Sequence, residues 1–303
     1  MKIPIVGVQN MSVKFGDFYA VRNVSFNVER GEIFGFLGAN GAGKTTTIRV
    51  LCGLLPASAG QVIIDGIEFR PQYADDIKRR VGYMSQRFTL YNDLSVGENF
   101  EFAASLRGLG RREFVARRDV LLEFIGFNKN LKTVVHDLPG GIKQEVALCV
   151  ALLHDPVIIF LDEPTAGVAP HARMRFWQLI KELAHSGKTI FVTTHYMDEA
   201  ENCSRVALMR AGELIAIDSP ANLKRKTFGD TLFSLRARWP KPIMPIPDVV
   251  DIWQAYGANF HLRFRDGINV AAQLRKLKRD WVITQIQPSL EDVFIKLVEG
   301  QNR

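Results

Sequence analysis

The sequence predicts an α/β fold in which a mostly parallel sheet carries an inserted helical segment and is followed by a small α/β appendage. Two apolar runs, at 157–161 and 189–192, are continuous and rich in β-branched and aromatic residues, as buried parallel strands are. The segment 173–184 between them has helical spacing. A strand, a helix and a second strand in this order predict a crossover unit and hence a parallel sheet.

Further strands and helices follow from the same periodicities. In the first part of the chain, apolar residues alternate with polar ones as in half-buried strands, and helical spacing follows one of these stretches. The pair Asp65-Gly66 adds a turn signal after a short apolar stretch. We therefore expect strands at 24–28, 32–37 and 62–64, a helix at 44–54 that ends near Gly53, and mainly helical structure from 96 to 127.

A change in composition near residue 220 divides the chain. Pro220 and the basic run 224–226 mark the boundary, and Pro240, Pro242, Pro245 and Pro247 interrupt the sequence that follows. We predict a first domain at 1–223, with an inserted helical segment at 87–150, and a small α/β domain at 224–303. In the second domain we expect strands at 260–264 and 281–286 and helices at 270–277 and 290–298.

The composition excludes several classes of protein. Of the 303 residues, 47% are hydrophobic and 23% are charged, so neither wholesale disorder nor a collagen-like repeat is expected. The formal net charge of +7 suits anionic partners such as nucleotides, nucleic acid or an acidic membrane face. The 3 cysteines include no CxxC pair, which favours a reducing compartment over disulfides or a zinc site. Because no apolar run approaches the roughly 18–20 residues of a membrane span, we expect a soluble chain.

The most specific chemical motif lies between a predicted strand and a predicted helix. Residues 38–45, GANGAGKT, match the pattern GxxxxGK[ST], in which glycines let backbone N–H groups turn towards a phosphate. Lys44 would reach the β- and γ-phosphates, and the Thr45 hydroxyl would face Mg²⁺. The alternative is a glycine-rich turn with a purely structural purpose. The nucleotide-binding candidates are Gly38, Ala39, Asn40, Gly41, Ala42, Gly43, Lys44, Thr45 and Thr46.

Acidic residues and a histidine follow the two buried strands. Asp162 and Glu163 come directly after 157–161, and His195 follows 189–192. Parallel strands end at one edge of a sheet, where ligands bind. Asp162 would hold Mg²⁺ through water, Glu163 would polarise the attacking water, and His195 would reach the γ-phosphate. In isolation, such residues would be a helix N-cap and a structural histidine, but the phosphate loop favours the catalytic interpretation.

With these motifs in place, residues 8–223 resemble the ATP-binding subunit of ABC transporters. The resemblance implies a P-loop NTPase cassette, in which a mostly parallel sheet core carries an antiparallel β subdomain and an inserted helical subdomain, with ATP and Mg²⁺ as ligands. Phe15 matches the aromatic residue that stacks on adenine, and Gln86 matches the glutamine that senses Mg²⁺ and the membrane partner. The implied catalytic residues are Glu163, His195 and Lys44, and the implied metal ligands are Thr45, Gln86 and Asp162.

Residues 138–144, LPGGIKQ, match the signature loop of the family. In the family this loop, here with Gly140 and Gly141, contacts the ATP of the opposite subunit, which implies a head-to-tail dimer. The chain departs from the family pattern at Pro139, where Ser is usual, at Glu145, where a basic residue is usual, and at Ala169, where Asp is usual. These positions lie in elements that serve the opposite site. We therefore hypothesise a heterodimer in which a second cassette supplies an intact signature loop, with a tolerant homodimer as the alternative.

The end of the chain resembles a narrower group. Residues 288–294, PSLEDVF, are similar to the ending of exporter ATPases of the daunorubicin-resistance type, which pair with separate transmembrane permease subunits of the ABC-2 class. This resemblance implies an export ATPase that is cytoplasmic and peripheral on the inner face of the cell membrane. The alternative is a capped terminal helix, because Asp292 follows Ser289 at capping-box spacing.

Two other functions stay open. A soluble ABC ATPase of translation or DNA repair would suit the positive charge, but the chain has one cassette, no long heptad region and no aromatic-basic motif, so no nucleic-acid partner is expected. A regulatory cassette that barely hydrolyses ATP would suit Ala169 but not the intact Glu163. The basic residues Arg275, Lys276, Lys278 and Arg279 would suit anionic lipid, although a solvated helix face is the simpler explanation.

Overall fold

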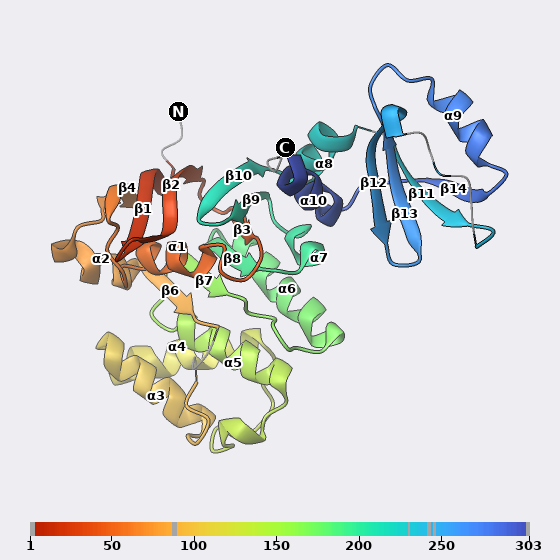
Figure 1. Cartoon of the computed structure of the whole chain (residues 1–303). Coiled ribbons are helices and arrows are strands. Elements are labelled where there is room, and N and C mark those ends of the chain that lie inside the picture. Colours follow the sequence, from red (N-terminus) through yellow and green to blue (C-terminus); the bar gives the residue numbers. More distant parts are fainter. Residues whose placement is uncertain (1–3, 87–89, 230, 241–243, 245–246, 301–303) are drawn as a thin grey trace. The chain divides into compact units, whose positions relative to one another are not determined.

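The computed structural model describes residues 4–86, 90–229, 231–240, 244 and 247–300, shown in Figure 1. The chain forms two compact units, Met1–Asp218 and Ser219–Arg303. Our predicted boundary at 223/224 would cut helix α8 (Pro220–Phe228), whose first turn is capped by the Ser219 hydroxyl, 3.2 Å from the Asn222 amide that donates to it. Pro220 therefore begins a helix, a position that proline favours, and it lies directly after the division between the two units.

A six-stranded sheet forms the centre of the first unit, in the order β10-β9-β3-β8-β7-β6. The five strands from β9 to β6 run parallel, and only the edge strand β10 pairs antiparallel. Every residue of β3, β7 and β8 is buried, which explains why their sequences show continuous apolar runs. The strands are β3 (Ile33–Leu37), β6 (Val81–Met84), β7 (Ile158–Asp162), β8 (Thr189–Thr194), β9 (Arg205–Arg210) and β10 (Glu213–Asp218).

A second sheet in this unit is antiparallel, in the order β2-β1-β4-β5. An aromatic cluster joins the cores of the two sheets: Phe26 of β2 stacks on Phe34 of β3 at 5.5 Å, and Phe160 of β7 lies 4.7 Å from Phe191 of β8. The two sheets therefore share one core. The strands are β1 (Val6–Phe15), β2 (Phe18–Val28), β4 (Ala59–Ile64) and β5 (Ile67–Glu68).

Helices complete the first unit, and Figure 1 shows α3, α4 and α5 grouped together, away from the antiparallel sheet. The predicted helical segment 87–150 holds these helices, while its first residues, 87–89, lie outside the described part of the chain. The helices are α1 (Lys44–Leu51), α2 (Ala74–Arg80), α3 (Val96–Arg107), α4 (Arg111–Phe124), α5 (Gly140–Leu152), α6 (Pro170–His185) and α7 (Met197–Ala200), with short 3₁₀ turns η1 (Pro71–Tyr73) and η2 (Val135–Asp137). Together, the parallel core, the antiparallel sheet and the helical insertion confirm the predicted cassette fold.

The second unit is the predicted small α/β appendage. Its antiparallel sheet has the order β12-β13-β11-β14, and Trp281 lies in a core with Phe233, Leu262 and Leu277. Of the prolines that lie between β11 and β12 in the chain, Pro242 and Pro245 are outside the described residues. The elements after α8 are β11 (Leu232–Ala237), η3 (Pro247–Val249), β12 (Val250–Tyr256), β13 (Asn259–Phe264), α9 (Val270–Leu277), β14 (Trp281–Ile286) and α10 (Leu290–Gly300).

The motif at 288–294 has a structural role in this unit. The Ser289 amide donates to Asp292 Oδ2 at 2.8 Å, and the Asp292 amide donates to Ser289 Oγ at 3.2 Å, which is a capping box. The other carboxylate oxygen of Asp292 lies 2.6 Å from His261 Nδ1 of β13, and both side chains are buried. The capped-helix interpretation of the motif is therefore confirmed, and the buried Asp292–His261 contact attaches α10 to the sheet.

None of the described helices is long and apolar enough to span a membrane. The cysteines Cys52, Cys149 and Cys203 are buried as free thiols. Burial raises the pKa of each of these thiols, to about 12 for Cys203, which keeps them protonated and unreactive.

Candidate functional site

The loop between β3 and α1 requires glycine at several positions. Gly41 and Gly43 have φ of 81° and 101°, a left-handed region that other residues rarely adopt. A Cβ on Gly38 would lie 2.3 Å from the Met209 carbonyl oxygen, and one on Gly43 would lie 2.6 Å from the Ala20 carbonyl oxygen. The loop therefore packs against neighbouring backbone and leads directly into the start of α1, an arrangement suited to a phosphate group.

Lys44, the first residue of α1, is buried with only 4% of its side chain exposed. Its ammonium donates to the carbonyl oxygens of Gly38 at 2.7 Å and Ala39 at 3.2 Å, and lies 3.7 Å from Glu163 Oε1. Burial lowers the pKa of Lys44, and the carboxylates of Glu163 and Asp162 oppose that effect. The loop's own carbonyls thus hold a cation at the place where the phosphates are expected.

Asp162, the last residue of β7, is almost completely buried. Its Oδ1 accepts hydrogen bonds from the hydroxyls of Thr45 at 3.1 Å and Thr193 at 2.6 Å. The Thr45 hydroxyl and the Asp162 carboxylate are oxygen donors of the kind that Mg²⁺ prefers, and Mg²⁺ in nucleotide sites takes its remaining ligands from phosphate and water. The residues present therefore fit a Mg²⁺ ion that arrives with a nucleotide.

Glu163 lies where the predicted catalytic residues meet. Its Oε2 accepts a hydrogen bond from Gln86 Nε2 at 3.0 Å and lies 3.1 Å from His195 Nδ1, while the Lys44 ammonium approaches its other oxygen. The Glu163 amide donates to the Thr193 hydroxyl at 2.9 Å. Its φ of 49° is unusual outside glycine, and such backbone conformations cluster at functional sites. The structure thus brings residues from three other segments, Gln86, His195 and Lys44, around the carboxylate of Glu163.

Other predicted site residues lie on separate elements. Phe15 ends β1 at the hairpin to β2 and is 52% exposed, so its ring is available for stacking. Gly140 begins α5 with open space around it, whereas a Cβ on Gly141 would meet the Ala172 Cβ of α6 at 2.6 Å. Gly141 is therefore required for the close packing of α5 on α6, whatever else it does. Pro139 is the N-cap residue of α5 and supplies no side-chain hydrogen bond.

Glu145 requires a correction. We expected its charge to be a departure in an element facing another subunit, but its side chain is 7% exposed and its Oε1 lies 2.6 Å from Arg175 Nε of α6 in the same chain. The position lies on the face of α5 that packs against α6, so the charge is neutralised within the subunit. Burial raises the pKa of Glu145, and the Arg175 guanidinium opposes that effect.

Replacing Arg175 should leave the buried Glu145 carboxylate without a partner and so destabilise the folded protein. Because Arg175 is half exposed, we expect Arg175→Ala to lower the free energy of unfolding by about 1–3 kcal/mol at pH 8, less than for a fully buried pair. Without the guanidinium the pKa of Glu145 rises further; below that pKa the carboxyl is neutral and needs no cation. The loss should therefore shrink as the pH falls. Urea unfolding at several pH values measures it, with Arg112→Ala, an exposed residue of α4, as the control. A loss that does not depend on pH would contradict the assignment to Glu145.

Ala169 is the exposed N-cap residue of α6, and it offers no side-chain acceptor to the helix that Pro170 begins. An acidic N-cap accepts hydrogen bonds from the first-turn amides and complements the helix dipole. We expect Ala169→Asp to raise the free energy of unfolding by about 1 kcal/mol, and Ala169→Asn to have most of that effect. Denaturant titration of the three proteins tests this, and equal midpoints would contradict it.

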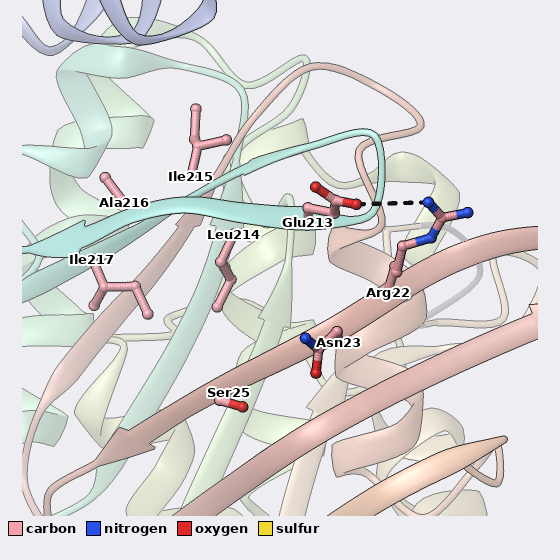
Figure 2. A pocket seen from close by; sticks show the side chains of 8 residues that line it. All are labelled: Arg22, Asn23, Ser25, Glu213, Leu214, Ile215, Ala216 and Ile217. Atoms are coloured by element: carbon pink, nitrogen blue, oxygen red, sulfur yellow. Dashed lines mark ion pairs between the residues drawn. The ribbon is translucent and has the colours of Figure 1, made fainter. Parts of the chain in front are cut away.

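Sequence reasoning missed Thr193, whose hydroxyl contacts both Asp162 and the Glu163 amide. Its position directly after the predicted buried strand 189–192 and two residues before His195 was the available signal. A separate pocket of about 480 Å³ lies between β2 and β10, which are edge strands of the two sheets (Figure 2). Arg22 and Glu213 face each other across it at 4.0 Å, and none of the predicted site residues lines it.

A cassette with a phosphate loop, a buried Asp-Glu pair and a histidine at one sheet edge defines a nucleotide-hydrolysing protein, and comparisons with known proteins agree. Residues 21–166 match the family model described as ABC transporter. Nod factor export ATP-binding protein I of Cupriavidus metallidurans is 33% identical over 301 residues, which cover 99% of each chain. The chain therefore belongs to the ATP-binding proteins of ABC transporters, whose general activity is ATP hydrolysis.

Three further comparisons, with one relative and two solved structures, support this assignment. The probable multidrug ABC transporter ATP-binding protein YbhF of Escherichia coli is 41% identical over 226 residues, which are 75% of this chain but 39% of that protein. Among solved structures, cbiO1 of Clostridium perfringens, part of the cbiONQ ABC transporter complex, is similar with a TM-score of 0.67 and 28% identity, over 73% of this chain and 90% of that one. A dimeric ATP-binding cassette, MJ0796, bound to ADP and Pi has a TM-score of 0.64 and 28% identity, over 71% of this chain and 98% of that one.

Proposed function

We propose that this chain is the ATP-hydrolysing subunit of an exporter whose pore is formed by separate membrane subunits of the ABC-2 class, and that it works on the cytoplasmic face of the cell membrane. The observation that carries this proposal is the similarity along the whole chain, including the second unit, to a protein named for Nod factor export. The tail motif at 288–294 caps α10 through Ser289 and Asp292, and its sequence also resembles the ending of this subclass.

The contacts around Glu163 support a specific division of labour. Lys44 and the glycine loop bind the phosphates, and Thr45 and Asp162 hold Mg²⁺, which neutralises phosphate charge when bound. Glu163 orients and polarises the attacking water, because its carboxylate lies at the end of β7 next to Lys44. Gln86 and His195 hold that carboxylate through Oε2, so a movement of either residue would move the base.

The proposed assembly is a dimer in which each signature loop completes the site of the other subunit. Glu145 is neutralised by Arg175, so Pro139 and Ala169 are the departures that bear on this contact. A homodimer would have to work with both, whereas a heterodimer would take an intact loop from a second cassette. Cooperative ATP turnover by the purified chain alone would retire the heterodimer.

The membrane subunits are proposed to dock beside β6, the strand that leads to Gln86. A pocket of about 560 Å³ opens there between α1, α2, β6 and α3. Leu54 and Leu106 line it and are 53% and 70% exposed, while Lys78 and Arg79 of α2 add cations that are paired with Asp75 and Asp76 of the same helix. An apolar and charged hollow of this kind suits an amphipathic segment of a partner protein.

Membrane recovery tests the proposal. The tagged chain should sediment with membranes and co-purify in fixed ratio with one multi-span membrane protein after extraction in mild detergent. Leu106→Glu should release it into the supernatant, whereas Val120→Glu, at a similarly exposed position on α4, should not. Recovery in the supernatant with bound RNA or DNA would contradict the proposal and support an ABC ATPase of translation or DNA repair.

A further inference from the structure

Glu199 of α7 is a buried carboxylate outside the group of residues assigned above. Its side chain is only 2% exposed, and each of its oxygens accepts one hydrogen bond. The Thr165 hydroxyl donates to Oε1 at 2.5 Å, and the Thr194 hydroxyl donates to Oε2 at 2.7 Å. A buried carboxylate is unfavourable unless it is fully hydrogen-bonded, so these contacts account for its presence.

The Thr165 and Thr194 hydroxyls come from the two segments that carry Glu163 and His195. Thr165 lies two residues after Glu163, in the loop that follows β7, and Thr194 directly precedes His195 at the end of β8. Both threonines are almost completely buried, which restricts their hydroxyls to this partner region. One carboxylate therefore sets the distance between the backbone beyond Glu163 and the backbone before His195.

A third connection runs from Glu199 to the start of α6. Arg173 Nε lies 3.3 Å from Glu199 Oε1, and the Arg173 amide donates to the Ala169 carbonyl oxygen at 2.9 Å. The Arg173 guanidinium also lies 4.2 Å from the centre of the Tyr196 ring, which is 4.1 Å from the His195 ring. The loop before α6 is thus connected to the His195 ring through a cation and an aromatic ring.

We infer that Glu199 is a positioning residue of the ATPase site: it holds Glu163 and His195 in their reacting geometry and connects that geometry to the loop at 166–169. The inference rests on the roles proposed above for Glu163 and His195. A shift of the base by about 1 Å can lower a rate about 10²-fold. Glu199 therefore acts on the rate of hydrolysis and not on the affinity for ATP, because neither of its oxygens contacts the phosphate loop or Lys44.

The first test compares two variants of α7 that each remove one negative charge. Glu199→Gln should lower kcat about 10- to 100-fold, counted per bound ATP, with an unchanged ATP dissociation constant. Asp198→Asn should keep the wild-type kcat, because Asp198 is 77% exposed and its carboxylate comes no closer than 4.0 Å to Arg173. A purely structural role would lower the number of ATP-binding chains and leave kcat per bound ATP unchanged, which would overturn the inference.

A second pair of variants removes and restores the hydroxyl on Thr165. Thr165→Val keeps the shape but cannot donate to Glu199, so it should lower kcat per bound ATP, whereas Thr165→Ser should restore most of it. Equal rates for the two variants would overturn the inference. Glu163→Gln, measured alongside, separates the catalytic role proposed for Glu163 from the positioning role inferred for Glu199. If Glu163→Gln stays active, the catalytic role fails. If Glu163→Gln is inactive while Glu199→Gln is fully active, only the positioning role fails.

Discussion

Replacing Glu163 by Gln is expected to lower kcat for ATP hydrolysis by about 10²- to 10⁴-fold, the usual contribution of a positioned general base. Glutamine keeps the size of the side chain and can still bond Gln86 and His195, but it cannot accept a proton from water. ATP binding should be retained, because Lys44 keeps its bonds to the loop carbonyls. Steady-state phosphate release and equilibrium binding of a fluorescent ATP analogue measure the two effects separately.

The matched control is Glu182→Gln, since Glu182 is an exposed residue of α6 whose contact is with Gln178 of the same helix. It should hydrolyse ATP at the wild-type rate. A Glu163→Gln protein that retains more than a tenth of the wild-type kcat would contradict the assignment of Glu163 as the base.

Replacing Lys44 by Met should impair binding as well as turnover. A hydrogen bond to a charged group contributes about 1.5–3 kcal/mol, so we expect ATP affinity to fall about 10- to 100-fold, with a further loss in kcat. Methionine fills a similar volume, which limits the disturbance at this buried position. Isothermal titration of Mg²⁺-ATP into the folded variant measures the loss.

Lys181→Met, at an exposed position of α6, controls for the loss of one positive charge and should bind ATP as the wild type does. If Lys44→Met binds ATP with wild-type affinity, the loop at 38–45 is not the phosphate site.

The elements that could be predicted are recognisable from the residue pattern of their own segment. Strands β7 and β8 are continuous apolar runs, and the phosphate loop is a contiguous octapeptide between a strand and a helix. In the second unit, the predicted helix 270–277 coincides with α9 and the predicted strand 281–286 with β14. Each of these elements has a clear periodicity of its own, so no knowledge of its neighbours was needed.

The elements that were missed depend on distant partners. Strand β6 has four residues and is recognisable mainly by its pairing with β7. In β12 the apolar sequence pattern is interrupted by Asp251, whose charge is neutralised by Arg263 and Lys296. The predicted helix 44–54 ends earlier, at Leu51, with Gly53 just beyond it at a φ of 71°. The stretch 96–127 is divided into α3 and α4 at Gly108, whose φ of 66° ends the first helix.

The same distinction applies to the site. Motif spacing was enough to predict that Lys44, Asp162, Glu163 and His195 lie together, because all follow strands or loops at one sheet edge. It could not show that Glu145 is paired with an arginine thirty positions later, since that pairing arises from the packing of α5 on α6. Glu199 was missed for a similar reason: its function depends on hydroxyls from two other segments.

The most direct test of the account is the rate of Mg²⁺-ATP hydrolysis per chain as a function of protein concentration, for the wild type and Glu163→Gln side by side. We expect the wild-type rate per chain to rise with concentration as shared sites assemble, for the chain alone if it forms a homodimer or on addition of a second cassette if it forms a heterodimer. Glu163→Gln should stay near zero throughout. A wild-type rate per chain that is independent of concentration, in a protein that remains monomeric with ATP, would contradict a site completed by two subunits.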